Sequence, residues 1–172
     1  MEILAIYHTC LQYKQTGHMN IKRLIKRIRR IFQAERWLFL DDTREPPLHL
    51  SKLFDVVRTY DEFVEYIETY GIPEIISLDH DLNLEHTNFF YENGGFRNPP
   101  DPKYEIFKFK TGYDCALWLV DYCRKNDKKL KKVFVHSHNP VGQRNIYNII
   151  CNFQKQQYGK TNCKIVRWKY QK

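Results

Sequence analysis

The sequence predicts an α/β domain in which a parallel β-sheet is covered on both faces by helices. From Arg36 onward, short apolar runs alternate with segments of helical periodicity. Strands that alternate with helices are typical of parallel sheets, because the connecting helices lie on the faces of the sheet. Three of the apolar runs also end in Asp or His residues, where the predicted strands stop.

Five apolar runs have the length of buried strands. The link Thr43–Phe54 between the first two shows no strong helical pattern, whereas a helix is predicted in each later link. The predicted strands are Trp37–Leu40, Asp55–Arg58, Glu74–Leu78, Lys132–Val135 and Cys163–Trp168.

Capping residues mark where the helices begin. Thr59 followed by Glu62 has the spacing of a capping box, and Asn139 followed by Pro140 is a typical helix start. Apolar positions recur at helical spacing behind each start. The sequence therefore predicts helices over Tyr60–Tyr70, from Thr111 to about Lys125, and from Asn139 to about Gln154.

Two segments lie outside this alternation. Residues 83–110 form a polar and aromatic insertion with no clear period, as expected of a lid, a binding loop or a mobile surface segment. Residues 1–35 form an N-terminal extension before the domain at 36–172, and from Met19 they follow the pattern of a basic amphipathic helix. That helix is expected to dock on the domain through its apolar face, or to contact RNA or an anionic surface.

The basic character of the chain belongs to this extension. The formal net charge is +8, and residues 19–36 hold seven basic residues against one acidic residue. The rest of the chain is almost balanced, which argues against a nucleic-acid-binding surface spread over the whole domain.

Composition and motifs exclude several classes of protein. With 42% hydrophobic and 15% aromatic residues, the chain can bury a core and is not wholly disordered. No apolar run is long enough to span a membrane, and residues 1–7 lack the features of an export signal. The five scattered cysteines are expected to be reduced and mostly buried, so we predict a cytoplasmic protein. Phosphate-loop, dinucleotide, serine-hydrolase and zinc-type motifs are absent from the sequence.

Candidate chemistry lies directly after three of the predicted strands. Ligands of open parallel sheets bind beyond the carboxyl ends of the strands, so neighbouring strands would bring these residues to one edge. One polar strand end is common because strand ends meet solvent, but three ends rich in Asp or His favour a site. They are Asp41-Asp42, Asp79-His80-Asp81 and His136-Ser137-His138-Asn139.

These residues allow two kinds of chemistry. The four carboxylates could bind Mg²⁺ or another divalent ion, or could orient a histidine through its ring N–H. His80 and His136 could flank a phosphorus atom as base and acid, although each could instead be a buried core histidine. For His138, a capping role and catalysis both stay open.

The helix that begins at Asn139 is a candidate anion site. Its first N–H groups and its dipole favour a phosphate beside His136, and Arg144 in its first turns could clamp a phosphate oxygen. The helix that begins at Thr111 offers a weaker second site of the same kind.

Three motifs, in order, carry a resemblance to a known family. They resemble the cyclic-phosphate processing receiver-like domain family, found widely in bacteria and phages, over about Arg36 to Trp168. This resemblance implies a flavodoxin-like three-layer α/β/α fold with the sheet order 2-1-3-4-5, and hydrolysis of a cyclic phosphate on RNA ends or nucleotides. The motifs are Asp41-Asp42 with Arg44 and Pro46, Ser77–Leu82, and His136–Ile146.

The resemblance also implies roles for single residues. By similarity to receivers, Asp41 and Asp42 form an acidic pair near a metal. Asp79 falls at the phosphoacceptor position, and Ser137 falls where a hydroxyl follows the fourth strand. No Lys-Pro pair follows the fifth strand, which argues against a phosphorelay. The additions that suggest catalysis are His80, Asp81, His136 and Asn139.

The leading hypothesis is therefore a phosphodiesterase that hydrolyses a cyclic phosphate by attack of water. Its expected catalytic residues are His80, His136, Asp79 and Asp81. The expected phosphate ligands are Asn139, Ser137, Arg144 and Arg44, and the expected metal ligands are Asp41, Asp42 and Asp79.

Two other hypotheses stay open. The chain could be a non-catalytic receiver-like module that binds or sequesters a cyclic nucleotide or a protein partner. In that case the aromatic residues of the insertion could stack on a base. Alternatively, the basic helix could direct the protein to RNA. The aromatic residues concerned are Phe89, Phe90, Tyr91 and Phe96.

Overall fold

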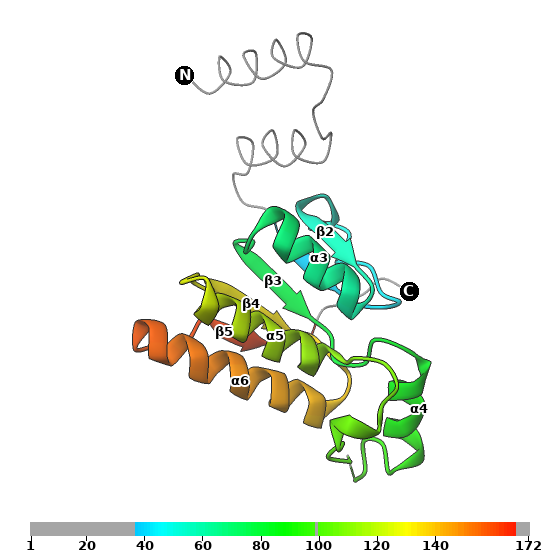
Figure 1. The fold of residues 1–172 in the computed structure, drawn as a ribbon. Coiled ribbons are helices and arrows are strands. Elements are labelled where there is room, and N and C mark those ends of the chain that lie inside the picture. The colour runs from blue at the N-terminus through cyan, green and yellow to red at the C-terminus, as the bar shows by residue number, and fades with distance from the viewer. Residues whose placement is uncertain (1–36, 99, 168–172) are drawn as a thin grey trace, which may run out of the picture. The chain divides into compact units, whose positions relative to one another are not determined.

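Five parallel strands form one sheet in the order β2-β1-β3-β4-β5, which confirms the receiver-like α/β class and the strand order that the resemblance implied (Figure 1). Within the described residues, helices pack on one face of the sheet only, so the predicted helical layer on the other face is not seen there. A computed structural model describes residues 37–98 and 100–167, so the expectations for residues 1–36 lie outside the described residues. The strands are β1 (Trp37–Leu40), β2 (Phe54–Val57), β3 (Ile75–Leu78), β4 (Lys132–Val135) and β5 (Cys163–Ile165).

Three strands differ slightly from their predicted bounds. β3 begins at Ile75, one residue later than predicted. β2 begins and ends one residue earlier than predicted, because Phe54 pairs with Trp37 at the start of β1. β5 ends at Ile165 instead of Trp168, because its partner β4 ends at Val135. The prediction for Trp168 itself lies outside the described residues.

Three helices pack against the sheet: α3 (Tyr60–Tyr70), α5 (Gly112–Lys125) and α6 (Pro140–Tyr158). Figure 1 shows them in a row, with α4 set apart beyond the end of β3. α6 continues past the predicted end at Gln154, because Gln154 is buried and donates to the carbonyl oxygens of Leu130 and Lys131. The helix ends where Gly159 adopts a left-handed conformation, with φ of 68°.

The capping predictions hold at all three helices, with one difference. Thr59 accepts from the Glu62 backbone N–H as predicted, but the Glu62 carboxylate accepts from the backbone N–H of Arg58 instead of Thr59. A complete capping box forms at α5, where Thr111 and Asp114 bond each other's backbone.

The two faces of the sheet carry different apolar clusters. One face packs with α3, α5 and α6 into a large core that includes Leu38, Ile76 and Val133. The other face carries Phe39, Phe54 and Ile75, against which Leu50 of the β1–β2 link packs. The only regular structure in that link is the 3-10 turn Ser51–Leu53, in agreement with its lack of a helical pattern.

The insertion is more regular than predicted. It contains helix α4 (Leu84–Glu92) and the 3-10 turn Tyr104–Ile106, so the expectation of a segment without periodic structure was wrong. Asn83 caps α4 by accepting from the backbone N–H of His86. The sequence of α4 lacks a continuous apolar stripe at helical spacing, because the buried position 86 is a histidine while the apolar Leu84 and Tyr91 are exposed.

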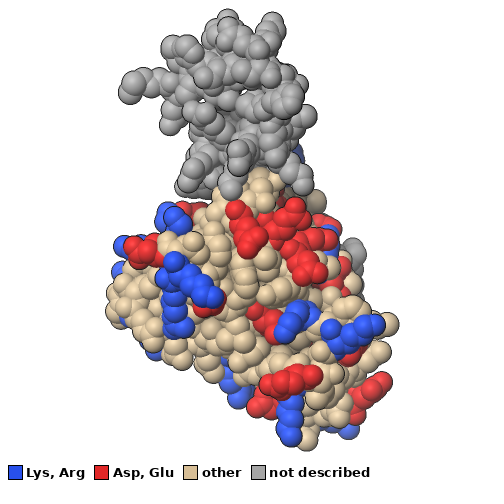
Figure 2. All heavy atoms as spheres, viewed as in Figure 1, with Lys and Arg blue, Asp and Glu red and all other residues tan. Residues whose placement is uncertain are grey.

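Charge on the described surface is mixed. Figure 2 shows acidic side chains gathered over α3, and basic and acidic side chains interspersed over the rest of this face. A single continuous basic surface is therefore not seen on this face of the described residues. The exposed acidic residues of α3 are Asp61, Glu62, Glu65 and Glu68.

Two further expectations concern cysteines and membranes. Cys115, Cys123, Cys151 and Cys163 are buried and form no disulfide, as predicted, and Cys10 lies outside the described residues. Within the part of the chain that the structure describes, no helix is both long enough and apolar enough to cross a membrane.

The start of α5 packs against the end of β3 without room for a side chain. A Cβ atom on Gly112 would lie 1.8 Å from the Asp79 carbonyl oxygen. We expect Gly112→Ala to lower the free energy of unfolding by about 1–3 kcal/mol, because backbone must shift to admit the methyl group. Urea unfolding followed by circular dichroism measures this. The control Glu65→Ala, on the exposed side of α3, should stay within about 0.5 kcal/mol of wild type. Equal midpoints for the two variants would contradict the close packing.

A neutral histidine fastens the insertion. His86 Nδ1 accepts from the Leu82 N–H at 3.0 Å and its Nε2–H donates to the Phe109 oxygen. Burial lowers the pKa of His86, although the Phe109 bond and the nearby Asp81 and Glu85 oppose this effect; His80 lowers it further. The unfolded chain therefore binds a proton more readily than the folded one, and this stabilisation is complete above about pH 6.5.

We therefore expect the insertion to loosen as the pH falls below about 6.5 and through the lowered folded pKa of His86. Hydrogen exchange of the α4 amides, corrected for intrinsic rates, should show weaker protection at the lower pH. His86→Gln, which stays neutral, should lose most of this pH dependence. Protection that is constant with pH in wild type would disprove the role of His86.

Candidate functional site

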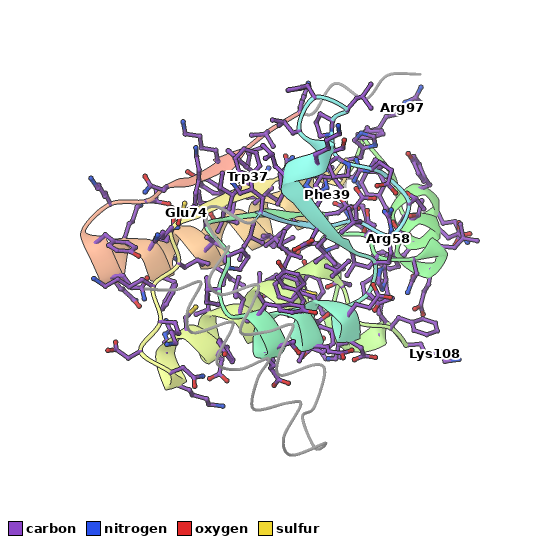
Figure 3. The ribbon with its side chains drawn as sticks, turned by 90° about the horizontal axis from the view of Figure 1, so that it is seen from above. Trp37, Phe39, Arg58, Glu74, Arg97 and Lys108 are labelled. Atoms are coloured by element: carbon purple, nitrogen blue, oxygen red, sulfur yellow. The ribbon has the colours of Figure 1, made fainter. Side chains whose placement is uncertain are left out.

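The ends of three neighbouring strands converge, as the sequence analysis anticipated. The Asp79 N–H donates to the Leu40 oxygen and the His136 N–H donates to the Leu78 oxygen, so the residues that follow β1, β3 and β4 stay in register. One side-chain ligand atom from each of Asp41, Asp79 and His136 lies within 4.8 Å of the others. In Figure 3, Trp37, Phe39 and Arg58 lie in this order from left to right, and the green helix α4 lies at the right-hand end of the sheet.

Arg44 lies between two of these acidic side chains. Its Nε is 2.6 Å from Asp41 Oδ2 and its Nη2 is 2.7 Å from Asp79 Oδ1. The contact with Asp79 is an ion pair whose angles fall outside those of a hydrogen bond. The turn after β1 fixes this arginine, because Asp41 Oδ1 accepts from the backbone N–H groups of Thr43 and Arg44.

Three acidic residues around Arg44 have pKa values that are shifted in different directions. Burial raises the pKa of Asp41, but hydrogen bonds from His136 and Arg44 and their charges outweigh it and hold this pKa below its ordinary value. Burial raises the pKa of Asp79, and the nearby His136 and Arg44 offset it only in part. Burial, together with the Asp41 charge, also raises the pKa of Asp42.

His136 is a buried connector between β1, β3 and β4. Its Nε2 lies 3.0 Å from Asp41 Oδ2, its Nδ1 lies 2.8 Å from Ser77 Oγ, and its ring stacks on Phe39 at 4.4 Å. Because an ionised carboxylate only accepts, Nε2 donates to Asp41, and Nδ1 shares the second hydrogen bond with the Ser77 hydroxyl. Both ring nitrogens thus have protein partners, and the side chain has no exposed surface.

His80 links the edge of the sheet to the insertion. Its Nδ1–H donates to Asp81 Oδ1 at 2.7 Å, and its Nε2 accepts from the Tyr104 hydroxyl at 3.1 Å. Tyr104 in turn accepts from Asn145 on α6 at 3.0 Å. Burial raises the pKa of Tyr104, so its hydroxyl keeps the proton that it donates. We call this chain, Asp81–His80–Tyr104–Asn145, the carboxylate relay.

The start of α6 packs directly on the relay. A Cβ on Gly142 would lie 2.2 Å from His80 Cγ, so only glycine leaves room for the ring. Asn139 caps the helix by accepting from the Gly142 N–H, and its amide lies 3.4 Å from Asp81 Oδ1. Ser137 is buried and accepts from the Asn139 N–H, so its hydroxyl orders the turn.

A pocket of about 340 Å³ opens at this edge of the sheet. Its size is at the lower end of that of small-ligand sites, roughly 300–1,000 Å³. Residues following β1, β3 and β4 line one side, and α4 supplies the other. The lining residues are Asp42, Thr43, Arg44, Asp79, Asp81, Leu84, Thr87, Phe90, Tyr91, His138 and Asn139.

The structure brings some of the expected site residues to the pocket and places others elsewhere. Asp42, Asp79, Asp81, Arg44 and Asn139 line it, together with His138, whose role the sequence left open. Asp41, His80, His136 and Ser137 lie behind this lining, buried and bonded to it or to one another. Arg144 is exposed on α6 and is not among the described residues that line the pocket.

Sequence reasoning missed the contributions of Tyr104, Thr87 and Thr43. Thr87 and Thr43 line the pocket, and Tyr104 completes the relay behind it. The weaker anion site expected at the start of α5 is closed, because Thr111 is fully buried and the Gly112 N–H donates to the His80 oxygen. A usable signal for α4 was Asn83, whose type favours a helix cap.

The cluster of Asp41, Asp79 and His136 has the ligand types and spacing that could hold a metal ion. In the present geometry the Arg44 guanidinium pairs with both of its carboxylates. The cluster therefore already contains a positive charge contributed by the chain.

Comparison with known proteins agrees with this geometry. The model of one family, the cyclic-phosphate processing receiver domain, matches residues 36–152. Neither the curated proteins nor the solved structures gave a match to this chain. The name of the family points to a phosphate-bearing substrate. Because the match spans more than half of the sequence and includes all three polar strand ends, the chain belongs to the cyclic-phosphate processing receiver domain family.

Proposed function

We propose that this protein is a hydrolase that opens a cyclic phosphodiester in the pocket beyond β1, β3 and β4. The observation that carries the proposal is the convergence of Arg44, His138 and Asp81, from three strand ends, on one pocket. This set offers a positive charge for the phosphate and two groups that can exchange protons with water or a leaving oxygen.

His138 is the acid–base residue of this proposal. It is exposed, lines the pocket and follows β4 closely. Partial burial lowers its pKa and the Arg44 charge lowers it further, while the Asp41 and Asp81 charges oppose this effect in part. The imidazole is thus neutral at neutral pH and can take a proton from a water that attacks phosphorus. One of the two ring P–O bonds then breaks, and the leaving oxygen takes a proton from solvent to give a phosphate monoester.

Asp81 is the second proton-exchanging group, and the carboxylate relay positions it. The His80 Nδ1–H holds Asp81 Oδ1, while 14% of the Asp81 side chain remains exposed. In this assignment His80 acts on the substrate through Asp81, and His136 acts through Asp41 and Arg44. Both are positioning residues, in place of the direct roles expected from the sequence.

The phosphate group would lie between Arg44 and the start of α6. Asn139 brings that helix start to the pocket, and no acidic residue occupies the first turn of α6. The helix dipole and the arginine therefore act together on an anion.

Aromatic residues of α4 suit a nucleoside next to that phosphate. Phe90 and Tyr91 line the pocket, and Tyr91 is 57% exposed. Exposed rings beside a phosphate site can stack on a base. A cyclic nucleotide, or an RNA end that carries a cyclic phosphate, is the proposed substrate class.

Removal of His138 should abolish most turnover. We expect His138→Ala to lower kcat by about 10²–10⁴-fold on whichever substrate wild type hydrolyses, since this is the usual contribution of a general acid or base. The substrates to compare are 2′,3′-cyclic nucleotides, 3′,5′-cyclic nucleotides and oligoribonucleotides with a 2′,3′-cyclic end. The control His49→Ala removes an exposed histidine of the β1–β2 link and should keep wild-type rates.

Undiminished turnover by His138→Ala would refute its catalytic role. Calorimetric binding of these substrates without any product from wild type would instead favour a module that sequesters the ligand.

Breaking the carboxylate relay should slow turnover without weakening binding. Tyr104→Phe removes the hydroxyl that donates to His80 Nε2. We expect kcat to fall roughly two- to twelvefold with KM unchanged, because one hydrogen bond contributes about 0.5–1.5 kcal/mol. Tyr113→Phe is the matched control, since Tyr113 stacks on Tyr104 at 4.0 Å and keeps its ring. Equal kcat values for the two variants would remove the relay from the mechanism.

A further inference from the structure

We infer that Arg44 takes the place of a divalent cation in the acidic centre of this receiver-like domain. The guanidinium lies against Asp41 and Asp79, the carboxylates that follow β1 and β3. The inference does not depend on the proposed reaction, because it concerns only which positive charge the buried carboxylates hold.

The ligand atoms of Asp41 and His136 are already engaged by protein groups, and Asp79 Oδ1 forms an ion pair with Arg44. Asp41 Oδ1 accepts two backbone N–H groups, and Asp41 Oδ2 contacts both Arg44 Nε and His136 Nε2. The second nitrogen of His136 is bonded to Ser77. An incoming ion would have to displace Arg44 and break the His136 bond before it gained these ligands.

The charge balance of the cluster also argues against a bound divalent ion. Mg²⁺ prefers about six oxygen ligands in a regular octahedron and keeps several waters. The cluster offers two carboxylates and one imidazole, all buried, and a guanidinium within 2.7 Å of both carboxylates. A second cation beside that guanidinium would be repelled in this poorly solvated place. The residues present therefore do not fit a divalent ion.

Arginine suits this role because its planar fork reaches two carboxylates at once. Hydrogen bonds also hold the backbone of Arg44 in place. The Arg58 guanidinium donates to the carbonyl oxygens of both Asp41 and Arg44 and also pairs with Glu45. The turn after β1 thus delivers a positive charge in a fixed position against both buried carboxylates.

Binding of Mn²⁺ to the full-length protein tests this inference. The loss of the free-ion electron paramagnetic resonance signal measures bound Mn²⁺. Each protein is compared with its Asp41→Asn counterpart, so that only the Asp41-dependent part is assigned to the buried cluster. We expect no Asp41-dependent binding at millimolar Mn²⁺ in wild type.

Arg44→Met removes the guanidinium and should create Asp41-dependent Mn²⁺ binding. Arg97→Met removes an exposed arginine and is the matched control for the loss of one charge, so it should behave as wild type. An Arg44→Met chain that is unfolded alone and folds when Mn²⁺ is added would support the inference equally. Asp41-dependent binding in wild type would overturn it, whatever the variants do, and so would a folded Arg44→Met that binds no Mn²⁺.

Discussion

The ion pairs of Arg44 with two buried carboxylates are the interaction on which the rest of the site depends. Parallel pairing of β1, β3 and β4 forces Asp41 and Asp79 close together, within a cluster whose ligand atoms span 4.8 Å. Like charges in such a place raise the pKa of one partner, and a positive charge beside both opposes this rise. Arg44 supplies that charge from the turn directly after Asp41. The Asp41 carboxyl group therefore stays ionised although the strand ends bring it close to Asp79.

Buried histidines connect the segments at this edge of the sheet. His136 joins β1, β3 and β4, His80 joins the end of β3 to the insertion, and His86 fastens the insertion upon itself. In each, both ring nitrogens have protein partners. An imidazole can donate and accept at the same time, which lets one small side chain satisfy two buried polar groups. The groups that face the pocket are consequently the neighbours of these histidines and not the histidines themselves.

Most of the fold could be predicted because its signals are local. The apolar runs, the caps at Thr59, Thr111 and Asn139, and the unpatterned β1–β2 link all have the expected structure. The insertion could not be predicted in the same way. Helix α4 has only His86 and Phe90 buried, so its buried face does not register as an apolar stripe. Its position is fixed by contacts made after the chain has folded, such as those of Tyr104 with His80 and Asn145.

The same difference between local signals and long-range contacts applies to the candidate site. The amino-acid sequence determined which chemical groups meet, because polar residues that follow neighbouring parallel strands necessarily share an edge. Only the tertiary structure decided which of them face the pocket and which lie behind it. The orientation of His136 depends on Ser77 and Asp41, 59 and 95 residues away along the chain, and no local pattern encodes such partners. Hydrogen bonds to distant residues turned His80 and His136 inward and left His138, which lacks such a buried position, exposed at the pocket.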